Sequence, residues 1–328
     1  MDLCKGTYNR GMIRAGVIGL GNMGRHHARA YSQIPEATLV AVCDMDSERL
    51  AACHREPDTV AYTTVDDMLE QANLDVVNIC LPTRYHYDVA KRCLARGIHT
   101  LIEKPITQTV AQANDLIALA QDRGVWLTVG HIERFNPAID CVTTAIRSGQ
   151  LGRIQSIICQ RYGPFPPQIT DSDVLVDVAV HDIDIAAHII QGPIVSQRVH
   201  TQSIHARDRA DFGHIHLVFE PDVSVTIVVS WAVPFKKRCM EIIGSKGVAY
   251  VDCLTQTVTL WPVEASVTAG GVIMPIQESV TLPVLPGEPI VLECQAFIAS
   301  VQHNRPPVVS PVAATQALAV ALMGREGA

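Results

Sequence analysis

The sequence lacks a long hydrophobic run: no stretch of about 18 consecutive apolar residues occurs among its 328 residues. A helix that crosses a membrane needs about 20 such residues. The first eleven residues also lack the apolar core of a secretory signal. We therefore expect a cytoplasmic protein without a membrane partner.

Paired cysteines and excess positive charge are absent as well. The ten cysteines form no C-x-x-C pair, and several lie within apolar segments, where a thiol behaves as a small hydrophobic group. This usage is typical of a reducing compartment and predicts no disulfide framework. The formal net charge of −7 argues against a nucleic-acid partner.

Apolar residues, in contrast, are abundant. They make up 48% of the chain, and charged residues make up 18%, which is typical of a globular protein with a large core. At about 150 residues per domain, the length predicts two domains. We expect an extension at residues 1–11, a nucleotide-binding domain at 12–130 and a second domain at 131–328.

A glycine-rich turn follows the first predicted strand. Residues 13–18 form a short apolar run, typical of a parallel strand buried on both faces, and residues 25–34 have helical composition. Between them, G-L-G-N-M-G is a dinucleotide-binding pattern whose glycines permit a tight turn, a close diphosphate and close helix packing. The helix N-terminus would face the diphosphate. We expect the cofactor to contact Gly19, Gly21, Asn22, Met23 and Gly24.

A carboxylate ends the second predicted strand, at residues 38–43. Asp44 follows Gly24 by about 20 residues, the spacing at which an acidic side chain binds the adenosine ribose. A carboxylate there would repel a 2′-phosphate, so the sequence favours NAD over NADP, although Arg49 keeps NADP possible. The alternative is that Asp44 only caps the helix that starts near Ser47.

Strand and helix patterns then alternate with short loops. This alternation predicts the α/β class, with a doubly wound, mostly parallel Rossmann sheet. Further strands are predicted at residues 60–63, 75–80, 98–102 and 125–129, and helices at 65–72, 85–96, 110–123 and 137–147.

Lys104 follows the strand at residues 98–102, within the sequence T-L-I-E-K-P-I-T. Proline cannot donate to a sheet ladder and disfavours helical conformation in the residue before it, so Lys104 is expected at a strand end. Open α/β sheets bind ligands at that edge. The residues expected to line the nicotinamide end of the cofactor are Leu81, Pro82, Thr83, His86, Glu103 and Lys104. For Thr83 and His86, helix capping is an equal alternative.

The second half of the chain is rich in short β patterns. Their spacing predicts an α+β domain with an open-faced, mostly antiparallel sheet. The strands are predicted at residues 154–162, 214–219, 223–230, 239–244, 248–252, 257–262 and 280–285, and later helices at 290–303 and 311–322.

One helical segment, residues 172–190, carries a polar stripe. Asp177, His181, Asp184 and His188 recur at helical spacing among Val, Ile and Ala, which places them on one helix face. An Asp one turn from a His can orient the imidazole of a general base. The alternative is a set of satisfied buried polar groups, which we favour for His188. The segment offers no third and fourth ligand at metal-site spacing, so no metal is expected.

Taken together, G-L-G-N-M-G, Asp44, E-K-P and D-x-x-x-H-x-x-D resemble the Gfo/Idh/MocA oxidoreductases from about Met12 to residue 265. Ala179 replaces a glycine of the usual pattern. The resemblance implies NAD as cofactor, a cis Lys104–Pro105 bond and a homo-oligomer, dimer or tetramer. It also implies a catalytic set of three residues. His181 takes the hydroxyl proton, and Asp177 orients His181 or the substrate hydroxyl. Lys104 stabilises the charge that develops on the reacting oxygen.

Within that family, G-H-I-E-R-F-N-P at residues 130–137 resembles the UDP-N-acetylglucosamine 3-dehydrogenases, which work with an aminotransferase. The resemblance implies a nucleotide-sugar substrate. Candidate substrate contacts, besides the catalytic set, are Arg134, Asn136, Arg161 and Tyr162, although strand packing is the more frequent role for the last two. The alternatives are a free-sugar or inositol dehydrogenase and, in a different class, a non-catalytic dinucleotide-sensing regulator.

Overall fold

The computed structural model describes residues 11–53, 58–167, 169, 172–206, 208–264, 266–268, 271–273, 275 and 277–326. These residues form two compact units. The first contains the described residues up to Ile132 together with Glu288–Ala319, and the second contains Glu133–Gly287 with the described residues from Val320. The expected extension at residues 1–11 lies outside the described residues except for Gly11.

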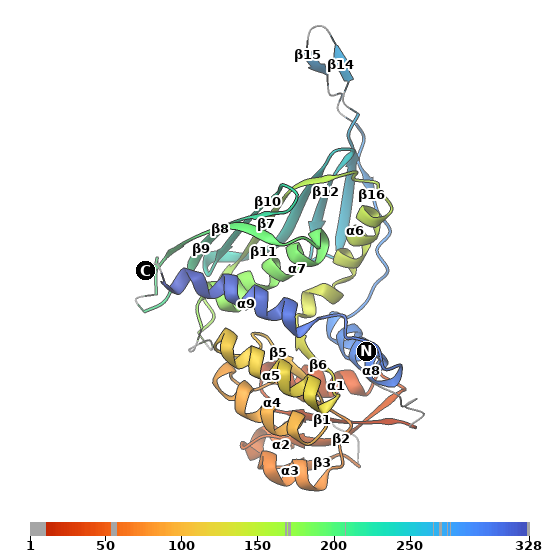
Figure 1. Cartoon of the computed structure of the whole chain (residues 1–328), viewed down its shortest axis with the longest axis vertical. Coiled ribbons are helices and arrows are strands. Elements are labelled where there is room, and N and C mark those ends of the chain that lie inside the picture. The colour runs from red at the N-terminus through yellow and green to blue at the C-terminus, as the bar shows by residue number, and fades with distance from the viewer. Residues whose placement is uncertain are drawn as a thin grey trace. The chain divides into compact units, whose positions relative to one another are not determined.

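The first unit is built on a parallel sheet of six strands (Figure 1). The strand order β3-β2-β1-β4-β5-β6 changes direction between β1 and β4, and open α/β sheets bind ligands at such a switch point. The predicted Rossmann topology is confirmed. The strands are β1 (Ile13–Ile18), β2 (Ala37–Cys43), β3 (Val60–Tyr62), β4 (Val76–Ile79), β5 (His99–Glu103) and β6 (Leu127–Gly130).

The helices of this unit begin and end at residues suited to those positions. Thr64 and Thr109 each accept a backbone N–H from the first turn of the helix that follows, and Gly124 ends one helix in the left-handed conformation. The helical elements are α1 (Asn22–Tyr31), α2 (Ser47–Ala52), α3 (Val65–Gln71), η1 (Thr83–Tyr85), α4 (His86–Ala95), α5 (Val110–Arg123) and α8 (Pro289–Gln302).

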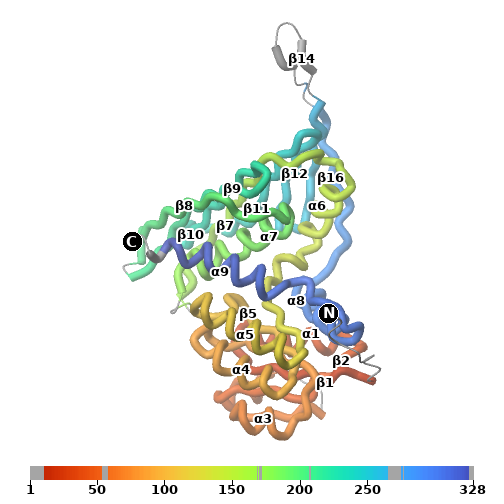
Figure 2. Tube along the Cα trace, viewed as in Figure 1, coloured from red at the N-terminus to blue at the C-terminus, as the bar shows by residue number. Residues whose placement is uncertain are grey.

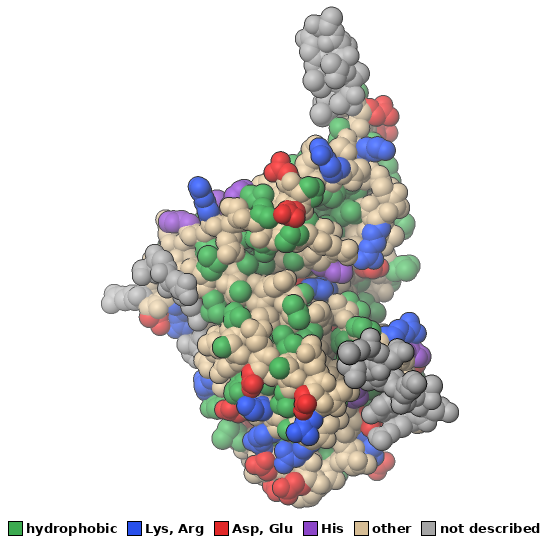
Figure 3. All heavy atoms as spheres, in the orientation of Figure 1, with side chains coloured by type: hydrophobic (Ala, Val, Ile, Leu, Met, Phe, Trp, Pro, Cys, Tyr) green, Lys and Arg blue, Asp and Glu red, His purple; other side chains and the backbone are tan. Residues whose placement is uncertain are grey.

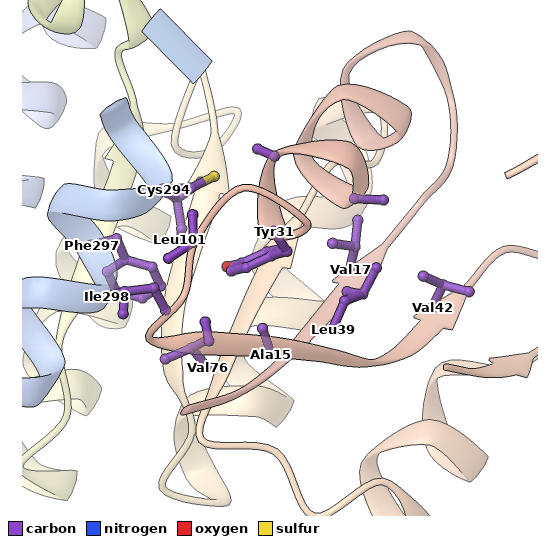
Figure 4. Close-up of a cluster of buried hydrophobic side chains, with 14 of the residues drawn as sticks. Ala15, Val17, Tyr31, Leu39, Val42, Val76, Leu101, Cys294, Phe297 and Ile298 are labelled. Carbon is purple, nitrogen blue, oxygen red and sulfur yellow. The ribbon is translucent and has the colours of Figure 1, made fainter. Parts of the chain in front are cut away.

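Helix α8 belongs to the first unit, although the sequence suggested a second domain that runs to the end of the chain. Figure 2 shows α8 beside α1, and the two helices pack together. The reason is burial: Cys294, Phe297 and Ile298 of α8 join Ala15 of β1 and Tyr31 of α1 in one apolar cluster (Figure 4). Burial of apolar surface contributes about 25 cal/mol per Å².

Acidic and basic side chains are interspersed on the face of the first unit that Figure 3 displays. Ion pairs link neighbouring helices of this unit: Lys91 with Asp115 at 3.1 Å, and Arg92 with Asp66 at 2.5 Å. Such exposed pairs contribute at most about 1 kcal/mol each. Their main effect is a surface of mixed charge.

The second unit is built on a sheet of eight strands in the order β16-β13-β12-β11-β7-β10-β9-β8. All pairs are antiparallel except β7 with β10, which confirms the predicted mostly antiparallel sheet. The strands are β7 (Ile154–Pro164), β8 (Ile194–Gln202), β9 (Phe212–Phe219), β10 (Val223–Ser230), β11 (Ala232–Gly244), β12 (Gly247–Asp252), β13 (Thr257–Pro262) and β16 (Val280–Thr281); a hairpin adds β14 (Ser266–Thr268) and β15 (Gly271–Ile273).

Helices cover one face of this sheet. Alternate residues of β10 and β12 are buried, while the others are half-buried, and α6 and α7 pack on the sheet. The helical elements that remain are η2 (Ile132–Phe135), α6 (Pro137–Arg147), the π-helical turn η3 (Leu175–Ala179), α7 (Val180–Ile190) and α9 (Pro311–Glu326).

Several segments differ from the sequence prediction. Strand β11 begins at Ala232 rather than at residue 239, β16 ends at Thr281 rather than at residue 285, and β14 and β15 were not predicted. Strand β8 was not predicted, because most of its side chains are exposed and it shows no alternation of buried and exposed positions. The segment predicted as one helix at residues 172–190 begins instead with η3, preceded by Asp173, whose Oδ1 accepts the N–H groups of Leu175 and Val176.

Candidate active site

The glycine turn has the backbone that close approach of a dinucleotide requires. Gly19 has φ 87°, and a Cβ on Gly24 would lie 1.7 Å from the carbonyl oxygen of Gly19. A Cβ on Gly21 would meet nothing within 4 Å, so the turn is open there, and no side chain caps the start of α1. The first N–H groups of the helix can therefore face a diphosphate. The residues present fit a bound dinucleotide.

Within this turn, Asn22 and Met23 occupy different environments. Asn22 is exposed at the first position of α1, whereas Met23 is half-buried against the apolar cluster of the unit. Direct cofactor contacts of the two side chains stay predictions.

Asp44 is buried at the end of β2 and ties that strand to the glycine turn. Its Oδ2 accepts the N–H of Leu20 at 2.7 Å, and its Oδ1 accepts the N–H of Asp46 at 2.9 Å. The helix α2 is capped by Asp46, not by Asp44, so the capping alternative applies to the neighbouring residue. Arg49 lies 3.8 Å from Asp44 and 3.3 Å from Asp46.

This arrangement predicts the cofactor preference. We expect kcat/KM for NAD⁺ to exceed that for NADP⁺ at least about tenfold, because the Asp44 carboxylate would repel a 2′-phosphate. Asp44→Asn should reduce this ratio, since the amide removes the charge and keeps an acceptor oxygen. Asp46→Asn is the matched control and should preserve the ratio. Equal efficiencies of the wild type with both cofactors would refute the assignment.

Lys104 follows β5 directly, and the Lys104–Pro105 bond is cis, as the resemblance implied. Glu103, the residue before it, is only 6% exposed. Its Oε1 lies 2.9 Å from His27 Nε2, and its Oε2 accepts the N–H of Lys104 at 3.1 Å. Both oxygens thus have partners inside the protein, and a cofactor contact of Glu103 stays a prediction.

The charge of Glu103 is set by competing effects. Burial favours its neutral form, but the hydrogen bond of His27 and the charge of Lys104 outweigh burial and hold the pKa of Glu103 below its usual range. Glu103 is therefore a carboxylate at neutral pH.

His86 is buried between two loops. Its Nδ1 lies 2.9 Å from the carbonyl oxygen of Pro105, and its Nε2 lies 2.7 Å from that of Leu81. The ring is only 1% exposed, and burial lowers its pKa against the opposing effect of the two carbonyls. A neutral imidazole has one N–H group, so His86 donates to one of these carbonyls. Its cofactor contact stays a prediction.

The other residues of the loop after β4 differ in exposure. Pro82 is exposed, while Leu81 and Thr83 are half-buried. Thr83 does not cap α4, because its backbone carbonyl accepts the N–H of His86 in the short turn η1. Cofactor contacts of Leu81, Pro82 and Thr83 stay predictions.

Asp177 and His181 lie in η3 and at the start of α7, respectively, and both are half-buried. A π-turn has more residues per turn than an α-helix. The i, i+4 spacing of Asp177 and His181 therefore does not by itself put the two side chains on one helix face. π-turns are frequent at functional sites. The mutual contact of the two side chains stays a prediction.

Arg161 lies among buried structural partners. Its guanidinium binds both oxygens of Asp182 at 2.9 Å and Oε1 of Glu133 at 2.9 Å, and the residue is 4% exposed. Each of its three nitrogens thus donates one hydrogen bond to a carboxylate. The contact of Arg161 with a substrate diphosphate stays a prediction.

Arg134 and Asn136 have structural partners as well. Arg134 binds both oxygens of Asp184, at 2.5 and 2.6 Å, and lies 3.5 Å from Nδ1 of His188. Asn136 caps α6 and donates to the carbonyl oxygen of Cys253 at 3.0 Å. The substrate contacts of both side chains stay predictions, and the contact with Arg134 is consistent with the structural role that we favoured for His188. Tyr162 is half-buried, and its substrate contact stays a prediction.

No sequence motif marks a cluster of buried polar side chains in the first unit. His27 and Tyr31 of α1 lie far along the chain from Asn78 and Glu293, yet all four are buried near Glu103. Among the described residues, no three His, Cys, Asp or Glu side chains form a group that could hold a metal ion. Within the same part of the chain, no helix has both the length and the apolar character needed to cross a membrane.

Comparison with known families matches both units. A family described as "Oxidoreductase family, NAD-binding Rossmann fold" matches residues 13–131, and "GFO/IDH/MocA C-terminal domain" matches residues 141–250. UDP-N-acetylglucosamine 3-dehydrogenase of Acidithiobacillus ferrooxidans is 31% identical over 314 residues, which cover 95% of this chain and 96% of that protein. Myo-inositol 2-dehydrogenase of Thermotoga maritima is 25% identical over 310 residues, 91% of each chain.

Solved structures of other oxidoreductases are similar to this chain as well. A structure of UDP-N-acetylglucosamine 3-dehydrogenase GnnA from Acidithiobacillus ferrooxidans superposes with a TM-score of 0.84 and 30% identity, and covers 96% of this chain and 97% of that one. An oxidoreductase from Agrobacterium radiobacter in complex with NAD⁺, L-tartaric acid and magnesium gives a TM-score of 0.80 at 17% identity, which supports the fold alone.

Proposed function

The chain belongs to the Gfo/Idh/MocA family of oxidoreductases, and from this premise we propose that it oxidises the C3 hydroxyl of UDP-N-acetylglucosamine. The product would be the 3-keto sugar. The observation that carries the proposal is the similarity to UDP-N-acetylglucosamine 3-dehydrogenase, because it extends over 95% of this chain at 31% identity. The inositol dehydrogenases are similar at lower identity.

The roles proposed for the residues are those that the resemblance to the family implies, and their chemistry suits them. When bound, NAD⁺ supplies the acceptor for the hydride that leaves C3. His181 accepts the proton of the C3 hydroxyl as the C=O bond forms, and Asp177 orients the imidazole or the hydroxyl. Lys104 donates a hydrogen bond to the reacting oxygen and stabilises the negative charge that develops there.

A substrate assay tests the proposal. UDP-N-acetylglucosamine with NAD⁺ is expected to produce NADH absorbance, with kcat/KM at least about a hundredfold above that of free N-acetylglucosamine. The reason is that the free sugar lacks the diphosphate, and hydrogen bonds to charged groups contribute about 1.5–3 kcal/mol each. Myo-inositol is the comparison substrate: faster oxidation of inositol or of the free sugar would establish the free-sugar alternative.

We also propose a pathway, an oligomeric state and a location for the enzyme. A 3-keto nucleotide sugar is a substrate for an aminotransferase, so we place the chain in a pathway to a 3-amino sugar of lipid A or a surface polysaccharide. The half-buried face of the eight-stranded sheet supports self-association as a dimer or tetramer. We propose the cytoplasm as its location, since thiols such as Cys43 and Cys159 are free and buried.

A further inference from the structure

A chain of buried hydrogen bonds runs from α1 to Lys104. Tyr31 donates its hydroxyl to Asn78 Oδ1 at 2.9 Å, and Asn78 Nδ2 lies 2.9 Å from His27 Nδ1. His27 Nε2 lies 2.9 Å from Glu103 Oε1. Because the amide nitrogen can only donate, His27 Nδ1 accepts and Nε2 carries the proton toward Glu103. The direction of every bond is thus fixed.

The chain ends on the backbone of Lys104. Glu103 accepts two donors, one on each oxygen: the His27 Nε2–H and the Lys104 N–H. A Cβ on Gly130, opposite Glu103 in β6, would lie 3.2 Å from the carboxyl carbon, so a larger residue would crowd this side chain. A carboxylate accepts one donor on each oxygen in this arrangement, whereas a carboxamide has an acceptor oxygen at only one of the two positions.

A second carboxyl lies beside this chain without a hydrogen bond. Glu293 of α8 is 2% exposed, and neither of its oxygens has a hydrogen-bond partner among the described residues. Burial and then the charge of Glu103 raise the pKa of Glu293 well above its usual range. An ionised carboxylate at this position would be costly, since two buried like charges repel.

The groups around Glu293 give it no counter-charge. They are Glu103 of β5, Tyr31 of α1, Cys80 after β4 and Cys294 of its own helix. Burial raises the pKa of Tyr31, Cys80 and Cys294, so these groups are neutral as well. Tyr31 and Cys294 enter the same apolar cluster from α1 and α8 (Figure 4).

We propose that Tyr31, Asn78, His27 and Glu103 form a positioning unit for Lys104 that carries one negative charge, on Glu103, and that Glu293 stays a neutral carboxylic acid beside it. This inference rests on the role proposed above for Lys104. The uncharged state of Glu293 matters because a second carboxylate would repel Glu103 and compete for its donors.

Infrared spectroscopy tests the state of Glu293 without substrate. The wild type at about pH 7 is expected to show the C=O band of a protonated carboxyl, and Glu293→Gln should remove it. Glu70→Gln, which changes an exposed glutamate of α3, is the matched control and should leave the band intact. A band that survives in Glu293→Gln, or is absent from the wild type, would overturn the assignment.

The melting temperature of Glu293→Gln gives a second test of the neutral state of Glu293, because the direction of its change can be predicted. The unfolded chain loses the proton of this glutamate above its ordinary pKa, while the folded chain keeps it, so the wild type loses stability as pH rises. Glu293→Gln should therefore raise the melting temperature by about 2 °C or more at about pH 8, and by less at about pH 5.5. A lower melting temperature, or a pH-independent shift, contradicts the proposal.

Glu103→Gln tests the positioning role. One donor, His27 Nε2–H or Lys104 N–H, would lose its acceptor, so turnover should fall about tenfold or more while NADH affinity changes less than about threefold. Equal losses of turnover and of NADH affinity, or an unchanged turnover, would exclude the positioning role of Glu103. If the wild type does not oxidise UDP-N-acetylglucosamine at all, the proposed function fails, and the infrared and melting results still decide the state of Glu293.

Discussion

Replacing Lys104 with methionine is expected to lower kcat at least about a hundredfold. Methionine keeps much of the length of the side chain but removes the ammonium, which is the group proposed to stabilise charge on the reacting oxygen. Groups of this kind contribute about 10²–10³ in kcat. The backbone N–H that binds Glu103 is unchanged by the substitution, so the strand end should keep its position. Steady-state kinetics with NAD⁺ and UDP-N-acetylglucosamine measure the loss.

The matched control is Lys91→Met, on the surface of the same unit. Lys91 binds Asp115 and Tyr87 and is about half exposed, so its loss should change kcat less than about twofold and leave stability nearly unchanged. Melting temperatures of both variants separate lost chemistry from lost folding. Near-wild-type turnover of Lys104→Met would remove this residue from the catalytic set.

The fold of the first unit was predictable because its signals are local. Short apolar runs bounded by glycine or proline mark β1, β4 and β5, and Thr109 and Gly124 mark both ends of α5 at the predicted residues. Strand β8 gave no such signal, since an edge strand with exposed side chains needs no alternation. The place of α8 was also not predictable, because its contacts with α1 join segments that lie more than 250 residues apart.

The residues of the candidate site also fall into two groups, those that could be predicted from the sequence and those whose partners could not. Gly19, Gly24 and Asp44 could be predicted because the backbone itself imposes their spacing. Arg134 and Arg161 were predicted as substrate contacts from their residue type and their position along the chain, and neither reveals which side chains they bind in the fold. Asp182 and Asp184 stand two residues apart on α7, and each takes one of the two arginines. These pairings depend on how strands and helices pack, which the sequence pattern does not contain.

Replacing Arg161 with methionine is expected to destabilise the protein by about 3–5 kcal/mol. The substitution would leave Asp182 and Glu133 buried without their main cation, and an unpaired buried charge costs more than the pair itself contributes. Asp182 follows His181 directly, so the loss should also disturb the start of α7. Denaturant unfolding measures the change, and the loss of activity should follow the loss of folded protein.

Two further variants separate the buried pair from a general effect of arginine. Arg238→Met removes the partly exposed cation that binds the same Glu133 oxygen at 3.1 Å, and should cost about 1 kcal/mol or less. Arg161→Met with Asp182→Asn removes one of the stranded charges, so it should recover part of the stability lost in Arg161→Met alone. If the double variant is less stable than Arg161→Met, the stranded charge is not the cause, and Arg161 acts through packing instead.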